Sequence, residues 1–228
     1  MTPRARFTKI CLDAVAPDEV GRFWAAALDR TWQPDGNGEG GVYGAARHPV
    51  LWINRVDAPK SVKNRVHLDI YAEELGHLEA LGATVLVPEG DDRRWTIMAD
   101  PEGAEFCAFL RPGPPEPRLH GLVVDAVHPA VVSRFWVAVL GGKYVDTCAE
   151  HTEVSNVPGM DFTFDFVAVA EPRTVPNRVY WDVEAASVEP ILAAGATSLR
   201  APGGDIDWHV LADPEGNEFC VMVRDAGE

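Results

Sequence analysis

The sequence repeats itself at an almost constant offset, and this repeat limits the possible folds more than any other feature. Arg22-Phe23-Trp24 recurs as Arg134-Phe135-Trp136, 112 residues later. Asp100-Pro101-Glu102-Gly103 recurs as Asp213-Pro214-Glu215-Gly216, 113 residues later. Because the offset changes by only one residue over a whole repeat, we interpret the chain as a tandem duplication of one structural unit.

A proline-rich segment separates the two copies. Residues 111–117 read Arg-Pro-Gly-Pro-Pro-Glu-Pro, a composition that continues neither a helix nor a central strand. We therefore predict one domain over 1–111, a linker over 112–118 and a second domain over 119–228.

Each copy divides again into two similar halves. Apolar residues at helical spacing, Val20, Phe23, Trp24, Ala27 and Leu28, predict a helix over 18–28 that buries this face. In the first copy we also predict a helix over 73–81 and strands at 7–13, 50–53, 65–70, 84–87, 95–99 and 105–110. Each half thus runs strand, helix and about three strands, so the chain is of the α+β class with four βαβββ modules.

Composition narrows the choice of partners and of cellular compartment. The 228 residues carry 20 basic and 35 acidic side chains, a net charge of −15. Such a chain repels phosphate backbones and anionic lipids, so we expect neither nucleic acid nor a membrane as a partner. The sequence contains no apolar stretch of membrane-spanning length and no signal core, and none of its four cysteines forms a CxxC pair. We expect a cytoplasmic protein with free thiols.

The modules and two of their motifs resemble a known superfamily. The second copy closes with Asp-Pro-Glu-Gly-Asn-Glu-Phe-Cys-Val at 213–221, and Asn-Arg-Val-His-Leu-Asp at 64–69 opens a second half. This pattern is similar to the vicinal oxygen chelate superfamily of glyoxalases, bleomycin-resistance proteins and dioxygenases, and most of all to its glyoxalase-like branch. The resemblance implies curved mixed sheets of eight strands around pockets. It also implies metal ligands on the first strand of each half and on the last strand of the domain.

Neither copy carries a complete set of ligands at the positions that the resemblance implies. The positions are Thr8, His67 and Cys107 in the first copy and His120, Tyr180 and Cys220 in the second. Cysteine stands where the family has a carboxylate, although Glu105 and Glu218 lie two residues earlier on the same strand face. We therefore expect no resident cofactor in a domain built from the halves of one copy.

Exchange of halves between the copies, as in some relatives, changes this expectation. It brings His67, His120, Glu105 and Cys107 to one pocket, a set suited to a divalent zinc, nickel, iron or manganese ion. The sequence leaves open whether the halves pair within or across copies.

Aromatic residues favour a pocket for a flat ligand. The predicted pocket residues are His67, His120, Tyr180, Trp95, Trp208, Trp52, Phe109 and Met222. Asp69 and Asp182 share one strand position and are interpreted as strand-end carboxylates that cap loops. The glycine-rich stretches at 36–44 and 203–204 lack the spacing of phosphate-binding motifs and are predicted to be loops.

Three functions are compatible with these patterns. The first is a pocket protein that binds a small, partly aromatic molecule without a complete catalytic metal site. The second is a metal-dependent lyase, isomerase or dioxygenase acting on vicinal oxygens through a site at His67 and His120. The third is a protein-interaction module with collapsed pockets. Four halves can satisfy one another within a chain, so we expect a monomer built as a pseudo-dimer, or a homodimer.

Overall fold

The computed structural model describes residues 2–45 and 48–224. Its elements follow the repeat four times. They are β1 (Arg6–Ala14), α1 (Pro17–Ala27), β2 (Thr31–Pro34), β3 (Gly40–Tyr43) and β4 (Leu51–Arg55); β5 (Val66–Ala72), α2 (Leu75–Ala80), β6 (Thr84–Val87), β7 (Thr96–Ala99) and β8 (Glu105–Leu110); β9 (Leu119–Ala126), α3 (Pro129–Leu140), β10 (Lys143–Cys148), β11 (His151–Ser155) and β12 (Thr163–Ala168); and β13 (Val179–Ala185), α4 (Glu189–Ala193), β14 (Thr197–Arg200), β15 (His209–Ala212) and β16 (Glu218–Val223).

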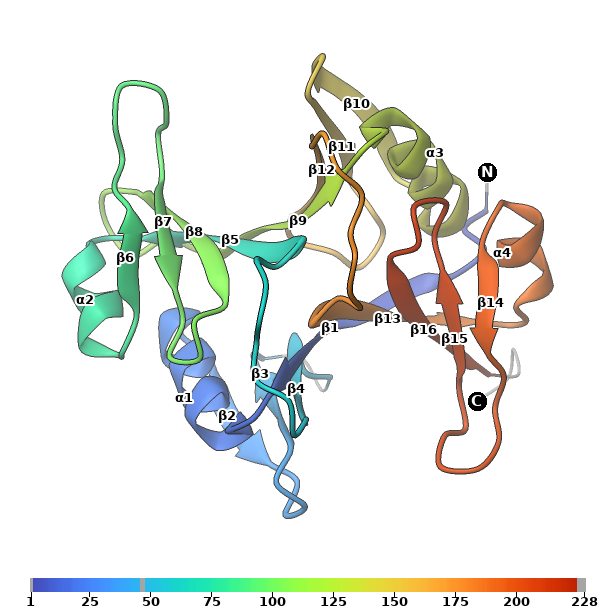
Figure 1. The fold of residues 1–228 in the computed structure, drawn as a ribbon, viewed down its shortest axis with the longest axis horizontal. Helices are drawn as coiled ribbons and strands as arrows, with labels where there is room; N and C mark the ends of the chain where they lie inside the picture. The colour runs from blue at the N-terminus through green and yellow to red at the C-terminus, as the bar shows by residue number, and fades with distance from the viewer. Residues whose placement is uncertain (1, 46–47, 225–228) are drawn as a thin grey trace. The chain divides into compact units, whose positions relative to one another are not determined.

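These strands form two eight-stranded mixed sheets (Figure 1). One sheet has the order β14-β15-β16-β13-β1-β4-β3-β2, and the other has the order β10-β11-β12-β9-β5-β8-β7-β6. Each sheet therefore joins the first half of one copy to the second half of the other. The predicted α+β class with four βαβββ modules is confirmed. The sequence left open whether halves pair within or across copies, and the strand order shows that they pair across copies.

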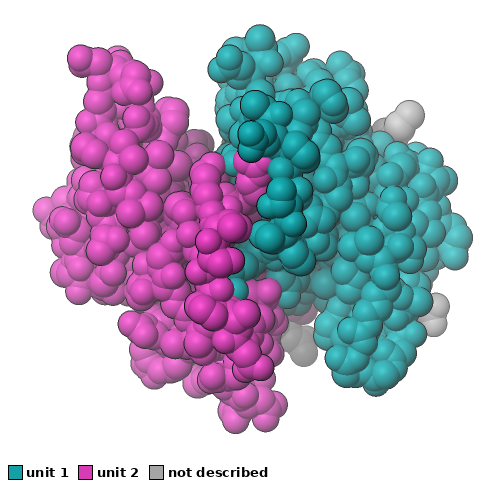
Figure 2. Space-filling view, viewed as in Figure 1, with its two compact units in different colours: residues 1–9, 123–228 teal, residues 10–122 magenta. Residues whose placement is uncertain are grey.

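The chain also divides into two compact units (Figure 2). Unit 1 comprises residues 1–9 and 123–228, and unit 2 comprises residues 10–122. The start of β1 thus belongs to unit 1, and the start of β9 belongs to unit 2.

Each of the two long helices buries an aromatic face, and for α1 this is the face that its sequence predicts. In unit 2, Val20, Phe23 and Trp24 of α1 are at most 2% exposed, and the rings of Phe23 and Trp24 pack against Phe106 of β8. In unit 1, Trp136 of α3 is fully buried against several aromatic rings. No helix in the part of the chain that the structure describes is long and apolar enough to cross a membrane.

One glycine-rich stretch that we predicted to be a loop contains a strand. Gly40 and Gly41 open β3, which pairs with both β2 and β4. A Cβ atom at Gly40 would lie 2.5 Å from the carbonyl oxygen of Gln33, and one at Gly41 would lie 2.5 Å from the Tyr43 ring. The glycines therefore permit close strand packing, so the loop prediction for this segment was wrong.

The repeated Asp-Pro-Glu-Gly turn ties each closing strand to the long helix of its unit. The buried carboxylate of Asp100 accepts hydrogen bonds from the backbone N–H of Glu102 (3.0 Å) and Ala104 (2.9 Å) and from Nε1 of Trp24 (3.4 Å). Burial raises the pKa of Asp100 to about 6. Asp213 makes the same bonds to its own turn and to Trp136, and burial raises its pKa as well. The conserved spacing within the repeat thus has a structural cause.

The glutamate of the same turn caps the helix from outside. Helix α1 has no side-chain cap of its own, but Glu102 accepts hydrogen bonds from the backbone N–H of Val15 (3.0 Å) and Ala16 (2.5 Å). A carboxylate at this end also complements the positive end of the helix dipole. Glu215 does the same for α3 through the backbone N–H groups of Val127 and His128.

We predict that Glu102→Ala lowers the free energy of unfolding by about 1–2 kcal/mol, because two backbone donors at the start of α1 lose their acceptor. Glu215→Ala should cost a similar amount at α3. Urea unfolding followed by circular dichroism measures both changes. Glu79→Ala, at an exposed site on α2, is the control, and a loss at Glu79 equal to that at Glu102 would contradict the capping role.

Candidate functional site

Strand β5 presents a row of half-buried side chains on one face of its sheet. Val66, Leu68 and Ile70 are at most 2% exposed, whereas the residues between them are partly exposed. Because side chains alternate along a strand, His67, Asp69 and Tyr71 share the more open face. The parallel register with β8 sets Asp69 beside Cys107 and Tyr71 beside Phe109.

Three metal-binding residue types meet at the start of this row. The ligand atoms of His67, Asp69 and Cys107 lie within 4.8 Å of one another. Nε2 of His67 is 3.5 Å from the Cys107 sulfur and 3.4 Å from Oδ1 of Asp69. That carboxylate oxygen is buried and has no hydrogen bond of acceptable geometry, although the histidine nitrogen is near. Burial, and next the charge of Asp69, raise the pKa of the Cys107 thiol, which is therefore protonated unless a cation displaces the proton.

An aromatic cluster follows immediately along the same face. The Tyr71 ring stacks on His120 of β9 at 4.4 Å, and Phe109 meets His120 edge-on at 5.4 Å. Trp95, just before β7, lies 5.5 Å from Phe109. All four side chains are only partly buried, so together they offer ring faces and edges to a molecule that settles on the sheet.

The structure brings together some of the predicted site residues and separates others. His67 and Cys107 lie side by side, and His120, Trp95 and Phe109 form the aromatic cluster. Glu105 instead binds Lys60 at 2.8 Å and accepts a hydrogen bond from the Asn64 backbone. Within the described residues, the donor group of His67 includes neither Glu105 nor His120. Trp52 lies on β4, in register with Cys11 of β1.

Asp69 is the site residue that our sequence reasoning misassigned. We interpreted Asp69 and Asp182 as strand-end carboxylates, but both lie within their strands. Asp69 shares a strand face with His67, and Asp182 shares one with Tyr180, because these residues are two positions apart. The signal was present in the sequence, because His67 and Asp69 are two residues apart in a strand and must share a face.

Unit 1 carries the equivalent face with a different charge arrangement. Tyr180 takes the place of His67, and Asp182 and Cys220 keep the places of Asp69 and Cys107. The ammonium of Lys9 lies 2.5 Å from Oδ2 of Asp182. Thr8, the predicted ligand position, only donates its hydroxyl to the Asp182 backbone carbonyl at 2.9 Å. A lysine thus supplies the cation beside this carboxylate, and Lys9 corresponds to Gly121 in the repeat.

The remaining predicted residues of unit 1 lie on β16 or next to β15. Burial, and next the charge of Asp182, raise the pKa of the Cys220 thiol, and Trp208 lies just before β15. Met222 takes the place of Phe109 on the last strand. Unit 1 therefore has neither the imidazole of His67 nor the phenyl ring of Phe109, because Tyr180 and Met222 stand at these positions.

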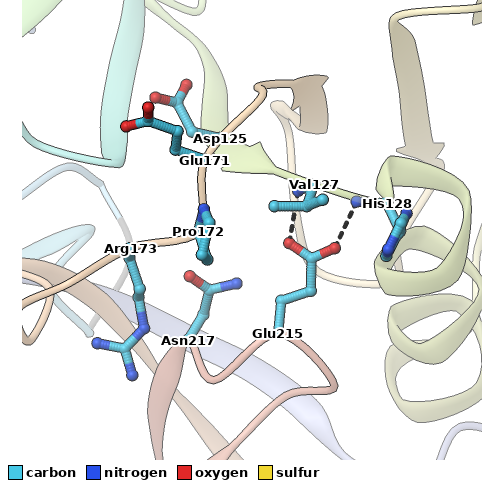
Figure 3. A pocket seen from close by; sticks show the side chains of 8 residues that line it. All are labelled: Asp125, Val127, His128, Glu171, Pro172, Arg173, Glu215 and Asn217. Carbon is cyan, nitrogen blue, oxygen red and sulfur yellow. Dashed lines mark hydrogen bonds between the residues drawn. The ribbon is translucent and has the colours of Figure 1, made fainter.

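A separate cavity of about 270 Å³ opens in unit 1 beside the Asp213 turn (Figure 3). Three of its polar side chains support the fold itself: Glu215 caps α3, Arg173 pairs with Glu218 at 2.8 Å, and Asn217 bonds Asp213. None of the predicted pocket residues lines it. The cavity is lined by Asp125, Val127, His128, Glu171, Pro172, Arg173, Glu215 and Asn217.

The fold and the site have the features of the vicinal oxygen chelate class. The βαβββ modules pair into two eight-stranded sheets, and polar residues lie on the first and last strands. The family described as Glyoxalase-like domain matches the chain twice, over residues 9–109 and 121–222. The chain belongs to this family, and the predicted resemblance is confirmed.

Solved structures agree on the fold. Glyoxalase I from Zea mays is 12% identical, with 96% of this chain and 92% of that chain covered and a TM-score of 0.65. A putative dioxygenase from Bacillus subtilis subsp. subtilis str. 168 is also 12% identical, with 98% and 86% covered and a TM-score of 0.65. The cppA protein from Streptococcus pneumoniae TIGR4 is 10% identical, with 96% and 99% covered and a TM-score of 0.54. No curated protein matches the sequence.

We predict that Lys9→Met lowers the free energy of unfolding by about 3 kcal/mol, because it leaves the carboxylate of Asp182 buried without its cation. The double variant Lys9→Met/Asp182→Asn should recover much of that loss, since it removes the unpaired charge. Urea unfolding of the four members of the cycle measures the coupling. Lys143→Met, at an exposed lysine, is the control, and additive effects of the two changes would contradict the ion-pair role.

Proposed function

We propose that unit 2 binds a small, partly aromatic molecule on the face formed by Tyr71, Phe109, Trp95 and His120. The observation that carries the proposal is the ring cluster itself, in which four half-buried rings lie within 4.4–6.3 Å of a neighbour on one sheet face. Rings in a protein core are usually covered, whereas these retain exposed surface beside a polar group of His67, Asp69 and Cys107. Such a combination of apolar surface and a few polar atoms is typical of small-molecule sites.

The unequal copies support placing the ligand in unit 2. Of the four ring positions, unit 1 has Glu184 for Tyr71, Met222 for Phe109 and Trp208 for Trp95, while His120 corresponds to Thr8. Only one of the four aromatic rings therefore recurs. A flat molecule gains less stacking surface in unit 1 than in unit 2.

We predict that Phe109→Ala lowers the affinity for such a ligand about tenfold or more, because it removes a ring from the centre of the cluster. Isothermal titration calorimetry against naphthalene, quinoline and flavone derivatives measures binding. Met222→Ala, the matched change in the second copy, should leave the affinity unchanged. If no member of this panel binds the wild-type chain, the proposal fails, and an equal loss in both variants contradicts the assignment to unit 2.

A second candidate function is favoured by the buried oxygen of Asp69 that has no hydrogen-bond partner. The imidazole of His67, the carboxylate of Asp69 and the thiolate of Cys107 suit zinc and related divalent ions, so these three residues would hold the metal. When bound, the ion would supply Lewis-acid chemistry to a substrate with vicinal oxygens, as in a lyase, isomerase or dioxygenase. Asp69 would balance the positive charge, and Cys107 would have to release its proton.

We predict that the purified chain binds close to one equivalent of zinc or cobalt and that Cys107→Ser reduces the bound metal severalfold, because the sulfur donor is lost. Elemental analysis after dialysis measures occupancy, and thiolate-to-cobalt absorption reports the sulfur ligand. Cys220→Ser is the matched control, since Lys9 already supplies a cation beside Asp182. Occupancy far below one equivalent with every added metal would exclude this second candidate.

A further inference from the structure

Two arginines beside Tyr71 lack the carboxylate that their counterparts possess. The Arg118 backbone carbonyl accepts a hydrogen bond from the Tyr71 N–H at 2.7 Å. Its side-chain Nε is buried and has no hydrogen-bond partner. The guanidinium of Arg111 lies over the Tyr71 ring, 4.6 Å from its centre, and donates to the Tyr71 hydroxyl at 3.2 Å. Within residues 2–45 and 48–224, neither guanidinium forms an ion pair.

The second copy shows what these arginines bind when a carboxylate is present. Arg118 corresponds to Arg6, and Arg111 corresponds to Arg224. In unit 1 both counterparts pair with Glu184, at 2.8 Å for Arg6 and 3.6 Å for Arg224. Glu184 occupies the strand position of Tyr71. The unit 2 site therefore has both cations of this arrangement, with Tyr71 in the place of the anion.

An arginine keeps its charge at every physiological pH, and its planar fork of donors matches a carboxylate. A buried N–H without an acceptor destabilises the free protein, so an acceptor that reached it from outside the chain would bind with a net gain. Tyr71, which stands at the position of Glu184, contributes a ring to the aromatic cluster. This one difference between the copies leaves the arginines without a carboxylate and adds ring surface at the same point.

We propose that the ligand of unit 2 is an aromatic carboxylate, held by its ring on the cluster and by its acid group between Arg111 and Arg118. This inference rests on the proposed function and adds the chemical class of the ligand. The acid group cannot lie at the opposite end of the row, because the carboxylate of Asp69 repels it. Asp69, two residues along β5, instead favours a cation or a hydrogen-bond donor of the ligand.

The test compares 2-naphthoate with its neutral isostere 2-naphthamide, by calorimetry on the full chain. We expect wild type to bind the carboxylate about tenfold or more tightly than the amide, because charge-assisted hydrogen bonds form only with the carboxylate. Arg118→Met keeps the length of the apolar stem and should reduce this ratio to near one. Arg6→Met, the matched change in unit 1, should leave the ratio as in wild type.

A second variant supplies the anion from the chain itself. Tyr71→Glu copies the residue that unit 1 tolerates at this position, so we expect a folded protein in which the new carboxylate pairs with Arg111 and Arg118. Its preference for naphthoate over naphthamide should disappear. Equal binding of both compounds by wild type overturns the carboxylate inference alone, whereas binding of neither contradicts the proposed function as well. A ratio lowered equally by Arg118→Met and Arg6→Met overturns the assignment to Arg118.

Discussion

The buried aspartate of the Asp-Pro-Glu-Gly turn is the interaction on which each unit depends. Asp100 holds its own turn through backbone donors and reaches the indole of Trp24, while Glu102 of the same turn caps the helix that carries this tryptophan. One tetrapeptide therefore fixes both the direction of the closing strand and the start of the helix. Because β8 is positioned in this way, its side chains meet those of β5 in a defined register, and that register creates the site.

The same scaffold supports two different balances of charge. In unit 2 a histidine, an aspartate and a cysteine come together beside exposed rings. In unit 1 the aspartate and cysteine persist, but Lys9 neutralises Asp182, and Glu184 neutralises two arginines. The fold of both copies rests on the shared turn and core, so these polar positions were free to diverge without loss of the architecture.

Much of the fold could be predicted from the sequence, because it rests on periodicity and turn chemistry. The buried face of α1 follows from apolar spacing, and the closing strands follow from the Asp-Pro-Glu-Gly turn. Strand β3 escaped prediction, since two glycines that allow close packing look like a loop. In unit 1, Lys9 reaches the carboxylate of Asp182, while Thr8 bonds only its backbone carbonyl. Local sequence did not reveal the ion pair, because its two residues lie on strands far apart in the chain. The meeting of His120 with Tyr71 depended on the strand order, which local sequence does not encode.

The lysine beside Asp182 has a consequence for how the two copies respond to their surroundings. A metal ion or a small ligand exchanges with solution, so the occupancy of a site that uses one varies with its concentration. The ammonium of Lys9 is covalently part of the chain and cannot dissociate or be removed by a chelator. The charge beside Asp182 in unit 1 is therefore set when the chain folds, whereas under the function proposed for unit 2 the charge at Asp69 would vary with the concentration of what binds there.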